Sequence, residues 1–288
     1  NFGSQAEWPA HPELLDWLAV EFARPTTLPS VGDEKAKSWD MKAMIKFIML
    51  SDAYKQKSSA PENLFKKDPE NRLLSRGPRM RLIGEVIRDQ ALFVGGLLVP
   101  KLGGPSVRPY MPKGVWSETN RYGNLKNYTA DSGEGLYRRS MYTIWKRTAA
   151  PPSMLLFDAP NREVCNPKRS RTNTPLQALA LMNEVTFVEA ARGLAELMIK
   201  KGGTSPKEKI TTGYRMATGL MPDTETLAIM LKNFNRRNNQ FKQDKEAAKS
   251  LVNTGESSYD SSLNVEELAA YTVTANVLLN LDQVLTKN

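Results

Sequence analysis

The stretch TPLQALALMNEVTFVEAARGLAELMIKKGG, residues 174–203, decides the fold class. Thr174 suits a helix N-cap, Pro175 takes the first helical position, and Gln177 is placed to close a capping box. After Glu184 the apolar residues return at helical spacing, which predicts a second helix directly behind the first. These residues are Phe187, Ala190, Ala191, Leu194, Leu197 and Met198, and Gly202 and Gly203 end the pattern.

The same helical signals recur on both sides of this stretch. Ser205 and Glu208 form a capping box, Asp223 starts a long helix, and Asn264 opens the last one. No alternating pattern typical of a strand persists. The sequence therefore predicts an all-α fold, an irregular helical bundle. Further helices are predicted over 11–23, from Asp40 to Tyr54 and within 71–98.

A loop-rich insert interrupts this helical pattern at about 101–173. Its densest part, YRRSMYTIWKRTAAPPSMLLFDAPNREVCNPKRSR at 137–171, holds eight basic and two acidic residues, which gives +6 of the chain's formal +9. Several prolines rule out one continuous amphipathic helix. The run predicts irregular backbone that is locked by side chains, which is where binding sites tend to lie. Within it, 141–156 is the weakest helical prediction and would also suit a short strand.

The insert supplies the candidate site for an anionic ligand. We expect its arginines to divide into a buried, paired group and a group that faces a groove beside Tyr110 or Trp116. Tyr122 is a third aromatic candidate for stacking against a carbohydrate. The alternative is that the arginines pair with internal carboxylates and the aromatics pack the loop onto the core. The candidates are Arg138, Arg139, Arg162, Arg169, Arg171, Asp158, Tyr110 and Trp116, with Arg147 in the same arginine set.

Two carboxylates on one predicted helix are also of interest. Glu85 and Asp89 lie four residues apart, and Arg81 and Arg88 lie one turn from them. Three interpretations stay open: an exposed salt-bridged face, a pair of carboxylates that fixes arginines in a buried network, or a pair that performs acid–base chemistry.

Composition excludes several classes of site. One histidine, His11, and one cysteine, Cys165, leave no metal site of the usual transition-metal kind and no C-x-x-C-H haem attachment, so we expect no metal and no cofactor held within this chain. No apolar run is long enough for a membrane span, and no nucleic-acid fold signature is present. The first residues carry no signal-peptide pattern, and we expect the chain to be a fragment of a longer protein.

Six ordered segments resemble one bacterial family: HPELLDWLA at 11–19, PENRLLSRGPRMRLIGEVIRD at 69–89, GGPSVRPY at 103–110, the arginine-rich run, NEVTFVEAARGLAE at 183–196 and VLLNLDQVLTKN at 277–288. The family is best known from planctomycetes, in large exported proteins in which a cytochrome-c-like domain precedes two domains of unknown function. This chain resembles the second of those two domains. We expect it to form one C-terminal helical domain over 1–288, whose helical C-terminal part is 174–288. The resemblance implies a periplasmic or cell-surface location, haem c in another domain, and the upstream domains as partners.

Two kinds of function fit these observations. The first is a non-catalytic binding or assembly module that presents a basic surface to an acidic polysaccharide or to a protein of an envelope assembly. The second is part of an enzyme: an oxidoreductase whose redox centre lies in another domain, or a carbohydrate-active enzyme that uses Glu85, Asp89 or Asp158. A structural subunit of an envelope assembly is a third alternative.

Overall fold

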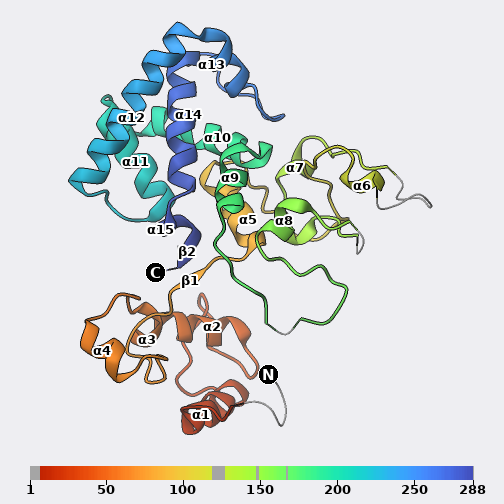
Figure 1. The fold of residues 1–288 in the computed structure, drawn as a ribbon. Coiled ribbons are helices and arrows are strands. Elements are labelled where there is room, and N and C mark those ends of the chain that lie inside the picture. Colours follow the sequence, from red (N-terminus) through yellow and green to blue (C-terminus); the bar gives the residue numbers. More distant parts are fainter. Residues whose placement is uncertain (1–6, 119–126, 147–148, 167, 288) are drawn as a thin grey trace. The chain divides into compact units, whose positions relative to one another are not determined.

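Helices dominate the computed structural model, which describes residues 7–118, 127–146, 149–166 and 168–287 (Figure 1). The predicted all-α fold is confirmed. Within the described ranges the only sheet is a pair of two-residue strands, β1 (Met80–Arg81) and β2 (Thr286–Lys287).

The chain divides into two compact units. Unit 1 comprises residues 1–80 with 287–288, and unit 2 comprises residues 81–286. The organisation of 1–288 as a single domain stays a prediction.

Unit 1 consists of short helices joined by turns. Asp40 caps the second helix by accepting a hydrogen bond of 3.0 Å from the amide of Ala43, as its sequence position predicts. The expected continuous helix to Tyr54 is wrong, because Ser51 adopts an extended conformation and caps a separate helix by accepting from the amide of Tyr54. The helices of unit 1 are α1 (Pro12–Ala23), α2 (Met41–Leu50), α3 (Asp52–Lys55) and α4 (Glu62–Lys67).

Unit 2 is built around two long helices, α10 (Val185–Lys201) and α14 (Val265–Leu279). Their contact faces are fully buried, with Ala190, Leu194, Leu268 and Tyr271 in the same core. Figure 1 shows α11, α12 and α13 arranged around α14. The other helices of this core are α5 (Gly84–Val94), α9 (Pro175–Asn183), α11 (Pro206–Thr218), α12 (Thr224–Gln243), α13 (Lys245–Val252) and α15 (Asp282–Leu285).

The helix starts of unit 2 follow the sequence closely. Thr174 accepts from the amide of Gln177 at 3.4 Å, which confirms the predicted start of α9. The predicted capping box is wrong here, because the Gln177 side chain donates to the carbonyl of Leu156 and to the hydroxyl of Thr172 instead. The box formed by Ser205 and Glu208 at the start of α11 is confirmed.

In the part of the insert that the structure describes, the regular structure consists of short pieces. They are α6 (Val115–Glu118), α7 (Glu134–Tyr137), the 3-10 helix η2 (Ser140–Tyr142) and α8 (Pro152–Leu156). A parallel β-bridge joins Val107 to Thr143. Among the described residues of 141–156, helical backbone is found in η2 and in α8, which begins at Pro152.

Candidate functional site

Helix α5 fastens the insert to the core through a buried guanidinium. Arg88 donates to the carbonyl oxygen of Leu136 at 2.6 Å and to that of Arg138 at 2.9 Å. Its burial lowers the pKa of the guanidinium, while the nearby Glu184 and Asp89 favour the charged form. Arg88 therefore supplies hydrogen-bond donors to two backbone carbonyls of the insert.

The two carboxylates of α5 each hold an arginine of the insert. Glu85 accepts two hydrogen bonds from Nη1 of Arg169, at 2.9 and 2.8 Å. Asp89 accepts from the amide of Ser140 at 2.6 Å and lies 3.5 Å from Nε of Arg139. Each carboxylate is thus paired with a partly exposed arginine of the insert, rather than with arginines in a buried network. The partners of both carboxylates are therefore structural groups of the insert, and neither carboxylate faces an open cleft.

Arg138 is a structural residue of the insert. Its side chain is only 5% exposed and donates to the carbonyl oxygens of Lys101, Gly103 and Pro105. The guanidinium also lies over the ring of Tyr142, 3.9 Å from its centroid. Because its hydrogen bonds are directed at one turn of backbone, Arg138 shapes that turn and is not placed to meet a ligand.

Residues 159–171, here called the basic loop, are pinned at both ends. Asp158, at a φ of 61°, accepts from the amide of Thr172 at 2.6 Å and from its hydroxyl at 2.9 Å. Near the start of the loop, the indole of Trp145 donates to the carbonyl of Asn161 at 3.4 Å. Asp158 thus closes the base of the loop.

The basic loop presents cationic groups to solvent. Arg162 is exposed, has a φ of 64°, and lies over the ring of Trp145 at 4.5 Å. Lys168 and Arg171 are exposed as well. An open cavity of about 480 Å³, the basic-loop cavity, is lined by Pro160, Arg162, Glu163, Val164, Cys165, Asn166 and Arg169. The structure places Arg162 beside Trp145 rather than beside Tyr110 or Trp116, and Arg147 lies outside the described residues.

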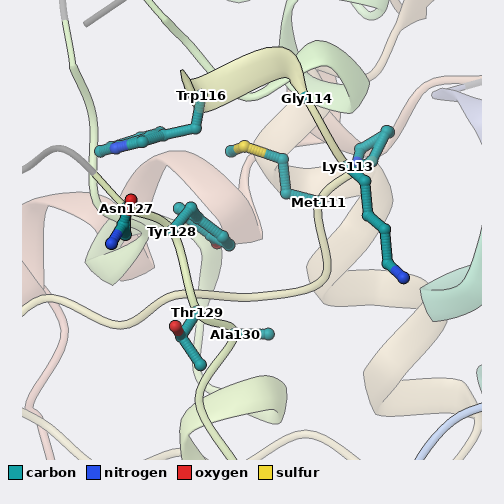
Figure 2. A pocket seen from close by; sticks show the side chains of 9 residues that line it. Met111, Lys113, Gly114, Trp116, Asn127, Tyr128, Thr129 and Ala130 are labelled. Carbon is teal, nitrogen blue, oxygen red and sulfur yellow. The ribbon is translucent and has the colours of Figure 1, made fainter. Parts of the chain in front are cut away.

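Trp116 lies in the wall of a second cavity (Figure 2). Its indole is 2% exposed, with the ring of Tyr128 at 5.0 Å and the amine of Lys146 4.5 Å from its centroid. This cavity, the Trp116 cavity, has a volume of about 580 Å³ and is lined by Met111, Pro112, Lys113, Gly114, Trp116, Asn127, Tyr128, Thr129 and Ala130. Tyr122 lies outside the part of the chain that the structure describes.

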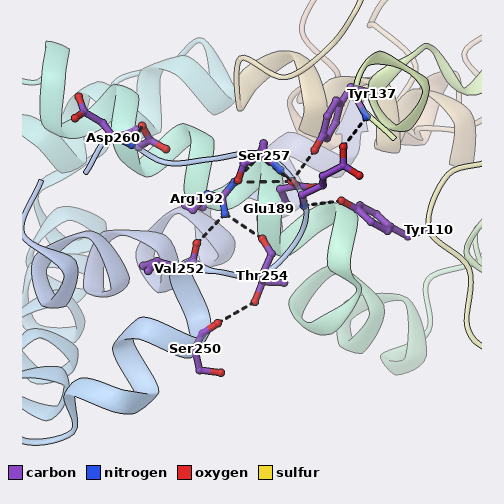
Figure 3. Close-up of polar contacts among 12 residues, drawn as sticks. Tyr110, Tyr137, Glu189, Arg192, Ser250, Val252, Thr254, Ser257 and Asp260 are labelled. Atoms are coloured by element: carbon purple, nitrogen blue, oxygen red, sulfur yellow. Dashed lines mark hydrogen bonds and ion pairs between the residues drawn. The ribbon is translucent and has the colours of Figure 1, made fainter. Parts of the chain in front are cut away.

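Tyr110 takes part in a polar network between the insert and the core (Figure 3). Its hydroxyl accepts from the amide of Glu256 at 2.8 Å. Tyr137 donates to Oε1 of Glu189 at 2.8 Å, and the amide of Ser257 donates to the same oxygen at 2.6 Å. Burial and the Glu189 carboxylate raise the pKa of Tyr137, which keeps the phenol protonated and able to donate.

This network depends on a charged stripe on α10 that sequence analysis missed. Arg192 donates to the carbonyls of Val252 at 2.7 Å and Thr254 at 3.0 Å, and Lys200 pairs with Asp260 at 2.9 Å. Together with Glu196, which accepts from the amide of Asp260, these side chains hold the whole segment 252–260. A signal was present: Glu189, Arg192, Glu196 and Lys200 recur at helical spacing in a helix that is otherwise mostly apolar.

The carboxylates expected to perform acid–base chemistry do not line the two cavities. A glycosidase needs two carboxyl groups across a cleft. Glu163 is the one carboxylate among the described residues that line the basic-loop cavity, and none lines the Trp116 cavity. Glu85, Asp89 and Asp158 line neither and serve the contacts described above. The expectation that the chain binds no metal or haem by itself stays a prediction.

None of the chain's described helices combines the length and apolar character needed to cross a bilayer.

Comparison with known proteins places the chain in a family. A search of curated proteins and a search of solved structures found no match. A family model, PSD1, matches residues 1–234, which is most of the chain. The chain therefore belongs to the PSD1 family, whose description is "Protein of unknown function (DUF1553)".

Proposed function

We propose that this chain is a non-catalytic binding module whose basic loop binds an acidic polysaccharide. The observation that carries the proposal is Arg162, exposed and stacked on Trp145 beside an open cavity, on a loop whose ends are pinned. Arg162, Lys168, Arg169 and Arg171 against Glu163 give the loop a formal charge of four minus one, +3.

The physical argument is pre-organisation. Holding a loop in place beforehand lowers the conformational entropy that binding must overcome. Asp158 and the Glu85–Arg169 pair hold the backbone, while the exposed Arg162 and Arg171 remain accessible to carboxylate or sulfate groups. A guanidinium recognises such groups with a planar fork of donors. The repeated negative charges of a polysaccharide would match several cations along one loop.

Affinity for polygalacturonate tests the proposal. In the double variant Arg162→Ala with Arg171→Ala, affinity at low salt should fall about tenfold, since two exposed pairs contribute about 0.7 kcal/mol each. Binding by the unchanged protein should also weaken with added salt. Arg215→Ala is the matched control, because Arg215 is an exposed arginine on α11 outside the basic loop. If the unchanged chain does not bind, or if the control loses as much affinity as the double variant, the proposal is wrong.

A second candidate, assembly with a protein partner, is favoured by unit 1. Helices α1 and α2 expose several large apolar side chains, and isolated proteins rarely expose large contiguous apolar patches. These include Leu14 46%, Leu15 59%, Trp17 41%, Val20 62%, Met41 67%, Ile45 52% and Met49 50%. Hydroxyl-radical footprinting would compare this chain with the intact native protein. Protection of Met41 and Met49 in the native protein supports assembly, and equal labelling contradicts it.

The resemblance to exported, cytochrome-containing proteins supports a more specific proposal about context. We propose that the chain is part of a planctomycete-type exported protein at the periplasm or cell surface, with haem c in an upstream domain. A role as part of an oxidoreductase, or as a structural subunit of an envelope assembly, would follow from the same context. The mass and absorbance spectrum of the native protein test it: a larger chain with a haem spectrum agrees, and a chain of this length without haem does not.

A further inference from the structure

The Trp116 cavity has walls that are held in place from behind. The hydroxyl of Tyr128 donates to the carbonyl of Pro109 at 2.5 Å, which anchors the ring that lines the cavity. Two chain segments, 111–116 and 127–130, form the walls, and hydrogen bonds join these segments at their base. There, Asp131 donates its amide to the carbonyl of Arg108 at 2.8 Å and accepts from the amide of Arg108 at 2.7 Å. These hydrogen bonds fix the described walls of the cavity at their base.

The lining combines an apolar surface with a few polar groups. Met111, Pro112 and Tyr128 supply the apolar and aromatic part, while the buried indole of Trp116 closes one wall. In the view of Figure 2, Asn127 lies on one side of the Tyr128 ring and Lys113 on the other. Apolar and aromatic surface suits the C–H faces of a sugar ring. A small number of placed polar groups is the usual means of orienting a ligand in such a pocket.

The described residues that line the cavity carry charge of one sign only. Lys113 is exposed and is the one charged side chain among the described residues that line the cavity. Asn127 and Thr129, also exposed, provide an amide and a hydroxyl that donate to and accept from hydroxyl groups. A ligand that satisfies this set carries one negative charge, several hydroxyls and an apolar face.

We propose that the Trp116 cavity binds a single uronic acid residue, with Lys113 at the carboxylate and Asn127 and Thr129 at the hydroxyls. The inference rests on the proposed function, because it names the sugar class of the acidic polysaccharide. The volume of about 580 Å³ lies in the range of small-ligand pockets, roughly 300–1,000 Å³. The ammonium of Lys113 is a compact point charge, which suits one carboxylate better than the several oxygens of a di- or triphosphate.

Calorimetric titration with digalacturonate and with its methyl ester tests this assignment. The ester keeps the hydroxyls and loses the charge. The unchanged protein should bind the acid at least tenfold more tightly than the ester. Lys113→Gln should abolish that preference, and Asn127→Ala should weaken both ligands. Lys201→Gln, at an exposed lysine on α10, is the matched control and should change neither. Lys113 and Asn127 are exposed, so unchanged melting temperatures should accompany these effects.

The outcomes separate this inference from the proposed function. Polygalacturonate binding that depends on Arg162 and Arg171, together with no digalacturonate binding, would overturn the cavity assignment and leave the basic loop intact. Digalacturonate binding that is unaffected by Lys113→Gln would also overturn it. If Arg162→Ala with Arg171→Ala leaves digalacturonate binding unchanged while polymer affinity falls, both are supported. If neither ligand binds, both are wrong.

Discussion

Glu189 on α10 accepts a hydrogen bond of 2.8 Å from the phenol of Tyr137, which lies 52 residues earlier in the chain. Both side chains are buried, and the same carboxylate oxygen accepts from the amide and the hydroxyl of Ser257. One carboxylate thereby joins the insert, the long core helix and the connection between α13 and α14. The position of the insert depends on this contact as well as on Arg88.

Tyr137→Phe should lower the free energy of unfolding by about 1.5–3 kcal/mol. A hydrogen bond to a charged group contributes about that much, and the substitution leaves the buried carboxylate with one donor fewer. Tyr54→Phe is the control, because Tyr54 is 42% exposed in unit 1. Urea denaturation measures both variants, and equal midpoints would contradict the role given to this bond.

Gly255→Ala should destabilise the chain more than Gly219→Ala. Both glycines have positive φ, 88° and 74°, so each alanine would be strained by about 1 kcal/mol or more. At Gly255 an added Cβ would also lie 2.3 Å from the carboxylate carbon of Glu189, whereas at Gly219 it would meet nothing within 4 Å. Thermal melting of the two variants measures the difference, which should be absent if the segment at Gly255 is free to shift.

Arg138→Ala should cost about 3 kcal/mol or more of stability, whereas Arg171→Ala should change it by less than about 0.5 kcal/mol. Arg138 is buried on three backbone carbonyls, which would lose their donors. Arg171 is exposed. Chemical denaturation of the two variants should show this contrast. Similar losses of stability in both variants would contradict the different roles given to the two arginines.

Thr174→Ala should cost about 1 kcal/mol, because it removes the side chain that caps α9. Thr211→Ala is a useful comparison, since Thr211 lies inside α11 and its hydroxyl donates to the carbonyl of Lys207 one turn earlier. The hydrogen exchange of amides 176–178 should also accelerate in Thr174→Ala. Unchanged exchange would argue against a role for the cap.

Acid should destabilise unit 1 through Glu21. The amide of Thr27, with smaller contributions from Thr26 and Leu28, lowers the pKa of Glu21 to about 2 from its usual 4.5. A carboxyl group with a lowered pKa stabilises the fold above about pH 4.5, and that stability is lost as the pH falls toward 2. As the pH falls between these values, Glu21→Gln should therefore lose less stability than the unchanged protein. Circular dichroism during acid titration tests it, and identical profiles for the two proteins would rule it out.

The local structure of this chain was largely predictable from its sequence. Thr174, Ser205 and Asp223 mark helix starts because a cap depends on a side chain and the amides two or three residues later. Asp40 also caps a helix as predicted. The end of that helix was not predictable, because Ser51 caps a new helix directly after it. The irregular nature of the insert followed from its prolines.

The partners of the polar side chains came only from the tertiary structure. Arg138, Arg162 and Arg171 look alike in one basic run, yet one is buried on carbonyls, one lies over Trp145 and one is exposed. The long-range contacts of Arg88 and Glu189 join residues about fifty positions apart. A residue's type and its neighbours in sequence determine which bonds it can form. Which of those bonds forms depends on the packing that brings distant backbone groups within reach, and only the folded chain decides that.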